Sequence, residues 1–219
     1  MEHILFKKSC LSPSGLAYDG TSLWITDEET KMLYRLDSNT GEVTFSRQIP
    51  SKITAMCWGM SKLWMLDNLE KAIICYDPAK DEICETIHLD LSDYLKPVDV
   101  HGLAFDGEYF WYSVEAGWSS RYYRLDKSGT QVFIFSECNP DKLACDSEYL
   151  WGICYNMGVH PCQVSRRVIN DDLSTMHRSR ENVYTLNELD RLSGLTVKQD
   201  NLLLIDQKSN AVIRVEGLK

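Results

Sequence analysis

Hydrophobic residues along the chain occur in short runs that alternate with polar residues, and groups of Gly, Asn, Asp, Ser or Pro separate the runs. The segments LWITD, MLYRLD and VTFSRQI are typical, with EETK and SNTG between them. Alternation with a period of two in such short runs predicts β-strands, and the turn residues between them predict short connections. The pattern therefore predicts an all-β chain built from short meanders.

The same meander recurs five times. The copies begin at Ser14, Thr54, His101, Asp141 and Ser193. Their aligned hydrophobic anchors are Trp24, Trp64, Trp111, Trp151 and Leu203, which are spaced by 40, 47, 40 and 52 residues. In the segments AYDGTSLW and AFDGEYFW, an Asp-Gly turn between apolar runs predicts a hairpin. Four strands in units of about 40–50 residues predict the blades of a β-propeller rather than a sandwich.

The N-terminal segment HILFKK, residues 3–8, precedes the first copy and has no other partner. The fifth copy ends at AVIRVEGLK, which corresponds to the third strand of a blade. We therefore expect residues 3–8 to supply the missing fourth strand, which would remove the exposed edge of the last blade. The predicted fold is a single domain, residues 1–219: an all-β, five-bladed β-propeller with four antiparallel strands per blade, closed by the N-terminal strand.

The segment GLAYDGTSLWITD, followed by YRLDSNTGEV, resembles the blades of bacterial cytoplasmic and secreted propellers in the broad NHL-like and virginiamycin B lyase-like grouping. The count of five blades is similar to that of plant-type glutamine cyclotransferases. The resemblance covers nearly the whole chain, but its motifs are blade motifs. It implies the fold, and for an enzyme it implies elimination or intramolecular cyclisation. Propellers host lyases, cyclases, hydrolases and non-catalytic scaffolds alike.

The net charge, the apolar runs and the cysteines indicate which partners and which compartment to expect. The formal net charge is −9 and no stretch is rich in Lys or Arg, so we expect no nucleic acid as a partner. The N-terminus lacks the pattern of a signal peptide, and no apolar run is long enough for a membrane span, so we expect a cytoplasmic protein that does not bind membranes. The eight cysteines form no CxxC pair, and we expect buried free thiols rather than a metal site.

Equivalent residues of a ring lie at equal height around its axis, so the five residues that begin the copies are expected to circle one mouth of the central channel. His101 is the only histidine among them, and an imidazole suits a general acid or base. Asp99 and Asp141 lie in neighbouring loops, and either carboxylate would be able to orient the ring of His101. The repeated Asp27, Asp67 and Asp206 at strand ends are interpreted as acceptors for turn amides. A histidine that is simply hydrogen-bonded at the start of a strand remains the alternative.

Irregular turns of the third and fourth copies supply the other candidates. In the third, Glu115 is the second acid–base candidate and Trp118 a candidate wall for substrate. In the fourth, Tyr155, Asn156 and His160 are candidate substrate-binding residues, and Asp99 in the loop before His101 is another. A Trp118 that folds over the blade is the structural alternative. His101, His160 and Glu115 would suit a facial metal set, but their spacing does not indicate that they converge, so we expect neither metal nor cofactor.

Two hypotheses for the function follow, and the sequence leaves open whether the chain is an enzyme. The first is an acid–base lyase or cyclase without a redox cofactor, acting on a small-molecule or peptide substrate at the channel mouth. His101, Glu115 and Asp141 would be its catalytic residues. The second is a non-catalytic propeller that binds a protein or other ligand, and its acidic surface would favour a basic partner. No GxSxG, GxxxxGK[ST], HExxH or GxGxxG motif indicates another chemistry.

Overall fold

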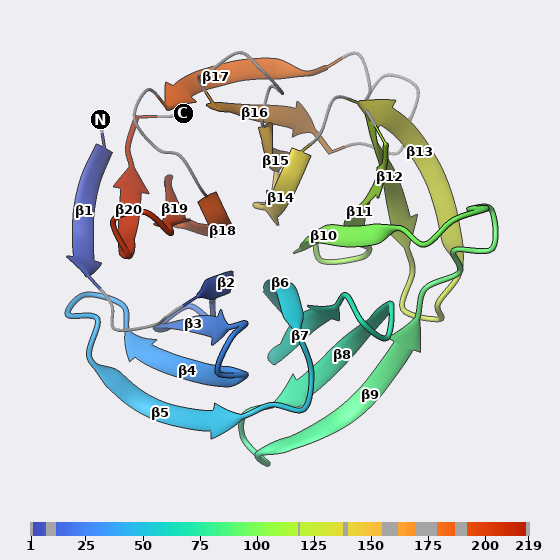
Figure 1. The fold of residues 1–219 in the computed structure, drawn as a ribbon. Coiled ribbons are helices and arrows are strands. Elements are labelled where there is room, and N and C mark those ends of the chain that lie inside the picture. The colour runs from blue at the N-terminus through green and yellow to red at the C-terminus, as the bar shows by residue number, and fades with distance from the viewer. Residues whose placement is uncertain are drawn as a thin grey trace.

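A ring of five small sheets makes up the protein in this computed structural model (Figure 1). The structure describes residues 2–7, 12–117, 119–137, 140–154, 162–169, 179–186 and 192–217. Each sheet contains four antiparallel strands, and the described ranges contain no helix. The fold is therefore a five-bladed β-propeller, as the repeat predicts.

The strands of each blade run outward from the channel in chain order. Blade 1 contains β2 (Pro13–Tyr18), β3 (Ser22–Asp27), β4 (Met32–Asp37) and β5 (Val43–Gln48). Blade 2 contains β6 (Ile53–Gly59), β7 (Lys62–Asp67), β8 (Ala72–Asp77) and β9 (Glu82–His88). Blade 3 contains β10 (Asp99–Phe105), β11 (Phe110–Ala116), β12 (Ser119–Leu125) and β13 (Gln131–Glu137). Blade 4 contains β14 (Pro140–Cys145), β15 (Tyr149–Cys154), β16 (Cys162–Val168) and β17 (Glu181–Leu186).

Blade 5 joins the two ends of the chain. It contains β18 (Leu192–Lys198), β19 (Asn201–Asp206) and β20 (Ala211–Val215), and its outermost strand is β1 (Glu2–Lys7). Strand β1 pairs antiparallel with β20, and the two termini lie close together in Figure 1. The closing strand that the sequence predicts is confirmed, one residue earlier than expected.

The tryptophan anchors are buried between blades, and hydrogen bonds fix all four of them to the preceding turn, Trp64 through the backbone oxygen of Gly59 at 3.0 Å. The indole Nε1 groups of Trp24, Trp111 and Trp151 donate to the carboxylate of an aspartate five residues earlier, at 2.8, 2.6 and 2.9 Å. The same carboxylate accepts the backbone N–H groups of the hairpin turn, as Asp106 does from Glu108 and Tyr109. One aspartate therefore sets both the turn and the direction of the buried indole.

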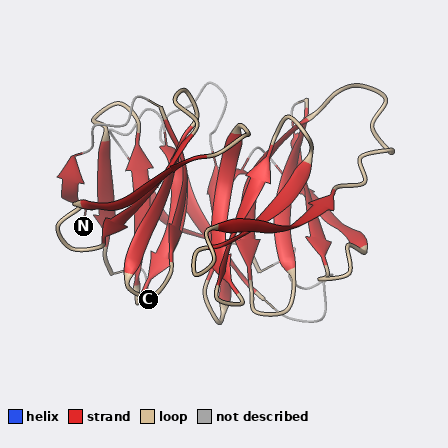
Figure 2. Ribbon diagram, turned by 90° about the horizontal axis from the view of Figure 1, so that it is seen from below, coloured by secondary structure: helices blue, strands red, loops and turns tan. Residues whose placement is uncertain are grey.

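The five inner strands, β2, β6, β10, β14 and β18, surround the central channel (Figure 1). The side view in Figure 2 shows strands that cross the thickness of the ring, with turns at its two faces. We call the channel opening at the N-terminal ends of the inner strands the upper mouth, and the one at their C-terminal ends the lower mouth. Neighbouring inner strands approach closely at Gly15, Gly102 and Gly194.

Replacement of Gly102 by alanine is expected to lower the free energy of unfolding by about 1–3 kcal/mol, because core overpacking costs this much. A Cβ at this position would lie 2.6 Å from Cγ of Leu143 and 3.0 Å from Oγ of Ser113. Urea denaturation of wild-type and Gly102→Ala protein measures the change.

The steric origin of this loss is testable with a second substitution. Leu143→Ala removes the atom that a new Cβ would meet, so it should cost less in the Gly102→Ala background than in the wild type. Equal costs in both backgrounds would contradict the proposed contact.

Candidate functional site

Each inner strand has a β-bulge at the upper mouth. The pairing register shifts between Pro13 and Gly15, Ile53 and Ala55, Val100 and Leu103, Pro140 and Lys142, and Leu192 and Gly194. The shifts contain Ser14, Thr54, His101, Asp141 and Ser193, the residues with which the five copies begin. A bulge bends the strand and changes the direction of a side chain, so these positions do not follow simple alternation.

Two of the three hydroxyl residues at this position bond to the next blade. Ser14 is 3 % exposed, and its Oγ donates to the backbone oxygen of Ile53 at 2.6 Å. Thr54 is 8 % exposed, and its Oγ1 donates to the backbone oxygen of Val100 at 3.0 Å. Ser193 is buried as well. The expectation that all of these residues line the open mouth is therefore wrong, because the three hydroxyl residues are buried and those of Ser14 and Thr54 turn toward a carbonyl of the next blade.

The repeated aspartates at the ends of the second strands bind turn amides. Asp27 accepts hydrogen bonds from the backbone N–H groups of Glu29 and Thr30. Asp67 and Asp206 accept the corresponding backbone hydrogen bonds in their own blades. All three are buried, and their structural interpretation is confirmed.

His101 departs from the hydroxyl residues of this ring. Its imidazole Nε2 lies 3.0 Å from Oε2 of Glu115, and the two residues come from the neighbouring strands β10 and β11. The side chains are 22 % and 47 % exposed, so solvent reaches both. The structure thus brings together two of the three residues that the sequence predicts for acid–base chemistry.

Asp99 faces the preceding blade. Its Oδ1 accepts a hydrogen bond from Nδ2 of Asn68 at 2.9 Å and lies 3.4 Å from Nζ of Lys71. The Asn68 hydrogen bond is the main cause that lowers the pKa of the Asp99 carboxyl, and the charges of Lys71 and His101 contribute. The carboxylate that contacts the ring of His101 is that of Glu115, whereas Asp99 links blades 2 and 3.

Lys142 is a functional candidate that sequence reasoning missed. It occupies the position at which three other copies have Gly15, Gly102 and Gly194. Its Nζ donates to the backbone oxygen of Thr54 at 3.1 Å, from blade 4 to blade 2. The backbone oxygen that Lys142 reaches therefore belongs to the ring position that His101 occupies in blade 3. The replacement of the repeated glycine by lysine was the available signal.

The remaining candidates lie outside what the structure describes. The backbone of Asp141 belongs to β14, but its side chain is not among the described ones. Trp118, Tyr155, Asn156 and His160 fall outside the described residues altogether.

Within the described ranges, no group of three or more His, Cys, Asp or Glu side chains is arranged to hold a metal ion. Those ranges also contain no helix long and apolar enough to cross a bilayer.

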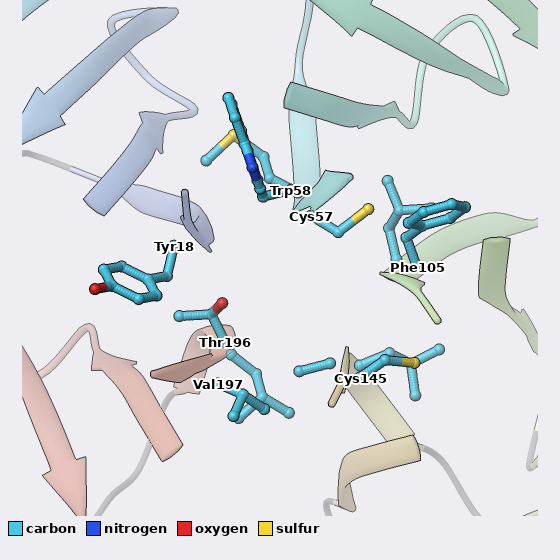
Figure 3. A pocket seen from close by; sticks show the side chains of 12 residues that line it. Tyr18, Cys57, Trp58, Phe105, Cys145, Thr196 and Val197 are labelled. Carbon is cyan, nitrogen blue, oxygen red and sulfur yellow. The ribbon is translucent and has the colours of Figure 1, made fainter. Parts of the chain in front are cut away.

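The lower mouth contains a cavity of about 70 Å³. Side chains from the ends of all five inner strands line it, including Tyr18, Trp58, Phe105, Cys145 and Val197 (Figure 3). Burial raises the pKa values of the thiols of Cys57 and Cys145 above their usual range, so both remain protonated. The lower mouth is therefore an apolar counterpart to the charged upper mouth.

Comparisons with known proteins identify the fold. No protein-family model matches the sequence, and no curated sequence is significantly similar to it. Among solved structures, Myxococcus xanthus glutaminyl cyclase is similar over 98 % of this chain and 95 % of its own, with a TM-score of 0.65 and 12 % identity. A streptogramin B lyase is similar over 98 % of this chain and 69 % of its own, with a TM-score of 0.54 and 15 % identity.

A chain from a nidogen/laminin complex is also similar, over 93 % of this chain and 75 % of its own, with a TM-score of 0.62 and 15 % identity. At such low identities the similarity concerns the fold alone. The comparisons therefore show a β-propeller fold, which this chain shares with two enzymes and with a chain from a protein complex.

Proposed function

We propose that this protein is an acid–base enzyme that acts on a small-molecule or peptide substrate at the upper mouth, by elimination or cyclisation and without a redox cofactor. The observation that carries the proposal is the 3.0 Å contact between His101 Nε2 and Glu115 Oε2. It occurs at the one described ring position where an imidazole replaces a structural hydroxyl.

Glu115 fixes the tautomer of His101 in this proposal. A carboxylate beside Nε2 favours the form in which Nε2 carries the proton, and Nδ1 is then free to accept one. This division of roles between a carboxylate and an imidazole is the same as in hydrolytic triads. Glu115 is a positioning residue, and His101 is the group that exchanges protons with substrate.

The proton transfers balance within the substrate. In an elimination, Nδ1 of His101 takes a proton from the carbon beside a carbonyl, and the electron pair of the broken C–H bond forms the double bond and expels the leaving group. The imidazolium then returns the proton to the leaving group. The Lys142 ammonium would bind the carbonyl oxygen or a carboxylate of the substrate and stabilise the negative charge that develops.

The similarity of the fold to a glutaminyl cyclase and a streptogramin B lyase guides the choice of test substrates. Peptides with an N-terminal glutamine release ammonia on cyclisation, and small esters with a leaving group β to the carbonyl release that group on elimination. We expect turnover of one of these classes by the wild-type protein. His101→Gln should reduce kcat/KM by about 10²–10⁴-fold, which is the usual contribution of general acid–base catalysis.

Two variants separate chemistry from folding. Glu115→Gln retains a hydrogen-bonding side chain but removes the charge, and it should shift the pH dependence of kcat/KM, which a purely structural role would not do. His88 is an exposed histidine on the outer strand of blade 2, and His88→Gln should leave activity unchanged. Equal activity of His101→Gln and wild-type protein would overturn the proposal. If no substrate is turned over and only a basic protein binds, the binding-module hypothesis replaces it.

A further inference from the structure

Two cysteines of blade 2 lie in direct contact, on strands that do not carry the candidate site residues. Sγ of Cys84, on the outer strand β9, lies 2.8 Å from Sγ of Cys75 on the adjacent strand β8. Both are free thiols in this structure. A separation this short leaves little movement for an S–S bond to form, because the two residues already belong to neighbouring antiparallel strands.

A bulge produces this contact. Cys75 pairs with Glu85 and Tyr76 pairs with Ile83, so Cys84 is the extra residue of β9. Without the bulge, Cys84 would oppose a β8 residue directly and its side chain would follow the alternation of the strand. The bulge instead directs the Cys84 thiol toward Cys75, as bulges redirect side chains elsewhere.

The two thiols differ in exposure, which decides which of them reacts first with a molecule from solution. Cys84 is exposed, and Nζ of Lys62 lies 3.4 Å from its sulfur. A neighbouring ammonium stabilises a thiolate, which is the reactive form. Cys75 is buried, and burial is the main cause that raises the pKa of its thiol to about 12, with its contact to Cys84 as the next cause. Cys84 is therefore the thiol that meets a solution oxidant first.

We propose that Cys75 and Cys84 are a reversible disulfide-forming pair that reacts with low-molecular-weight disulfides. The Cys84 thiolate attacks one sulfur of the small disulfide, whose S–S bond breaks and releases one thiolate. Cys75 then loses its proton and attacks Sγ of Cys84, which expels the second small thiolate. Two protein thiols are oxidised, one small disulfide is reduced to two thiols, and the two protons end on those products.

The disulfide would link the two outer strands of blade 2, β8 and β9, and close the short chain segment between Cys75 and Cys84 into a loop. Constraint of the unfolded chain by such a loop stabilises the native state. We expect the oxidised protein to melt about 2–8 °C higher than the reduced protein, since a chain of this size gains a few degrees for each kcal/mol. The protein would thus be more stable in oxidising than in reducing surroundings, through a bond at the outer edge of blade 2.

Oxidised glutathione tests the proposal with the full-length protein. After incubation under native conditions, trypsin digestion and mass spectrometry should find the peptide of residues 72–80 disulfide-linked to that of residues 81–121. Cys75→Ala should stop at the mixed disulfide, with glutathione retained on Cys84. Lys62→Met removes the ammonium that lies 3.4 Å from Sγ of Cys84, and it should slow the first step several-fold.

Cys84→Ser serves as the matched control at an exposed position, and it should abolish both the linkage and the rise in melting temperature. The wild-type protein alone decides the result if a variant fails to fold. Absence of the linkage between residues 72–80 and 81–121, or a stable glutathione adduct on Cys84 of the wild type, would overturn the proposal. Enzyme activity plays no part in these readouts, so the outcome is independent of the proposed function.

Discussion

Deletion of residues 1–8 should lower the melting temperature by about 10 °C or more, the largest effect that we expect from a change outside the core. Strand β1 pairs with β20 over five residue pairs. Its removal deletes the hydrogen bonds of that ladder, each worth about 1 kcal/mol, from a total stability of about 5–15 kcal/mol. Each lost kcal/mol lowers the melting temperature of a domain of this size by about 2–4 °C. Thermal denaturation followed by circular dichroism measures the change.

The deletion also converts β20 into an unprotected edge. Its residues Val212, Ile213 and Val215 are buried in the intact ring. An exposed edge favours pairing with other chains, so size-exclusion chromatography should show oligomers of the truncated protein. A synthetic peptide of residues 1–9 should restore part of the stability by binding to this edge, whereas a scrambled peptide should not. A truncated protein that is monomeric and melts within 2 °C of the wild type would show that β1 contributes little to closure.

Replacement of Trp111 by alanine should lower the free energy of unfolding by about 4–7 kcal/mol. The side chain is fully buried and packs with Tyr122, Phe135, Leu143 and Leu150 between blades 3 and 4. Truncation of a buried tryptophan costs about 3–5 kcal/mol through lost contacts and the cavity that remains. The hydrogen bond from its indole to the Asp106 carboxylate at 2.6 Å adds about 1–2 kcal/mol. Urea denaturation measures the loss at constant m-value.

Two further variants separate packing from hydrogen bonding. Trp111→Phe retains most of the aromatic volume but leaves Asp106 without its indole donor, so it should cost less than alanine but more than a neutral exchange. Trp58→Ala, at the edge of the lower-mouth cavity where the side chain is only partly buried, should cost less than Trp111→Ala. Comparable losses for the Trp58 and Trp111 variants would contradict the view that the anchor position carries blade-to-blade packing.

Short-range features of the fold follow from local sequence. The Asp-Gly turns, the tryptophan anchors and the period of the copies are local patterns, and each of them recurs in the structure as predicted. The contact between His101 and Glu115 is also within reach of such reasoning, because the two residues lie on adjacent strands of one blade. A histidine where other copies have a hydroxyl was the signal that distinguished this position.

The directions of several side chains depend on strand register, which the sequence pattern does not specify. The bulges that bury Ser14 and Thr54 add one residue to a strand, and no shared residue type marks them, since Gly15 follows the first and Ala55 the second. The same holds for the bulge that brings Cys84 to Cys75. A shift of one residue reverses the face on which a side chain lies, so strand patterns alone do not place these groups.

By itself, the sequence determined the five-bladed propeller, the strand that closes it and the unusual third blade, because these depend on residue periodicity and on local turn chemistry. The tertiary structure decided which side chains meet. Lys142 reaches Thr54 across the channel only because the ring closes, and Asp99 turns to Asn68 only because blades 2 and 3 pack side by side. Contacts between blades depend on how the blades are arranged around the closed ring. Local sequence patterns do not specify this arrangement.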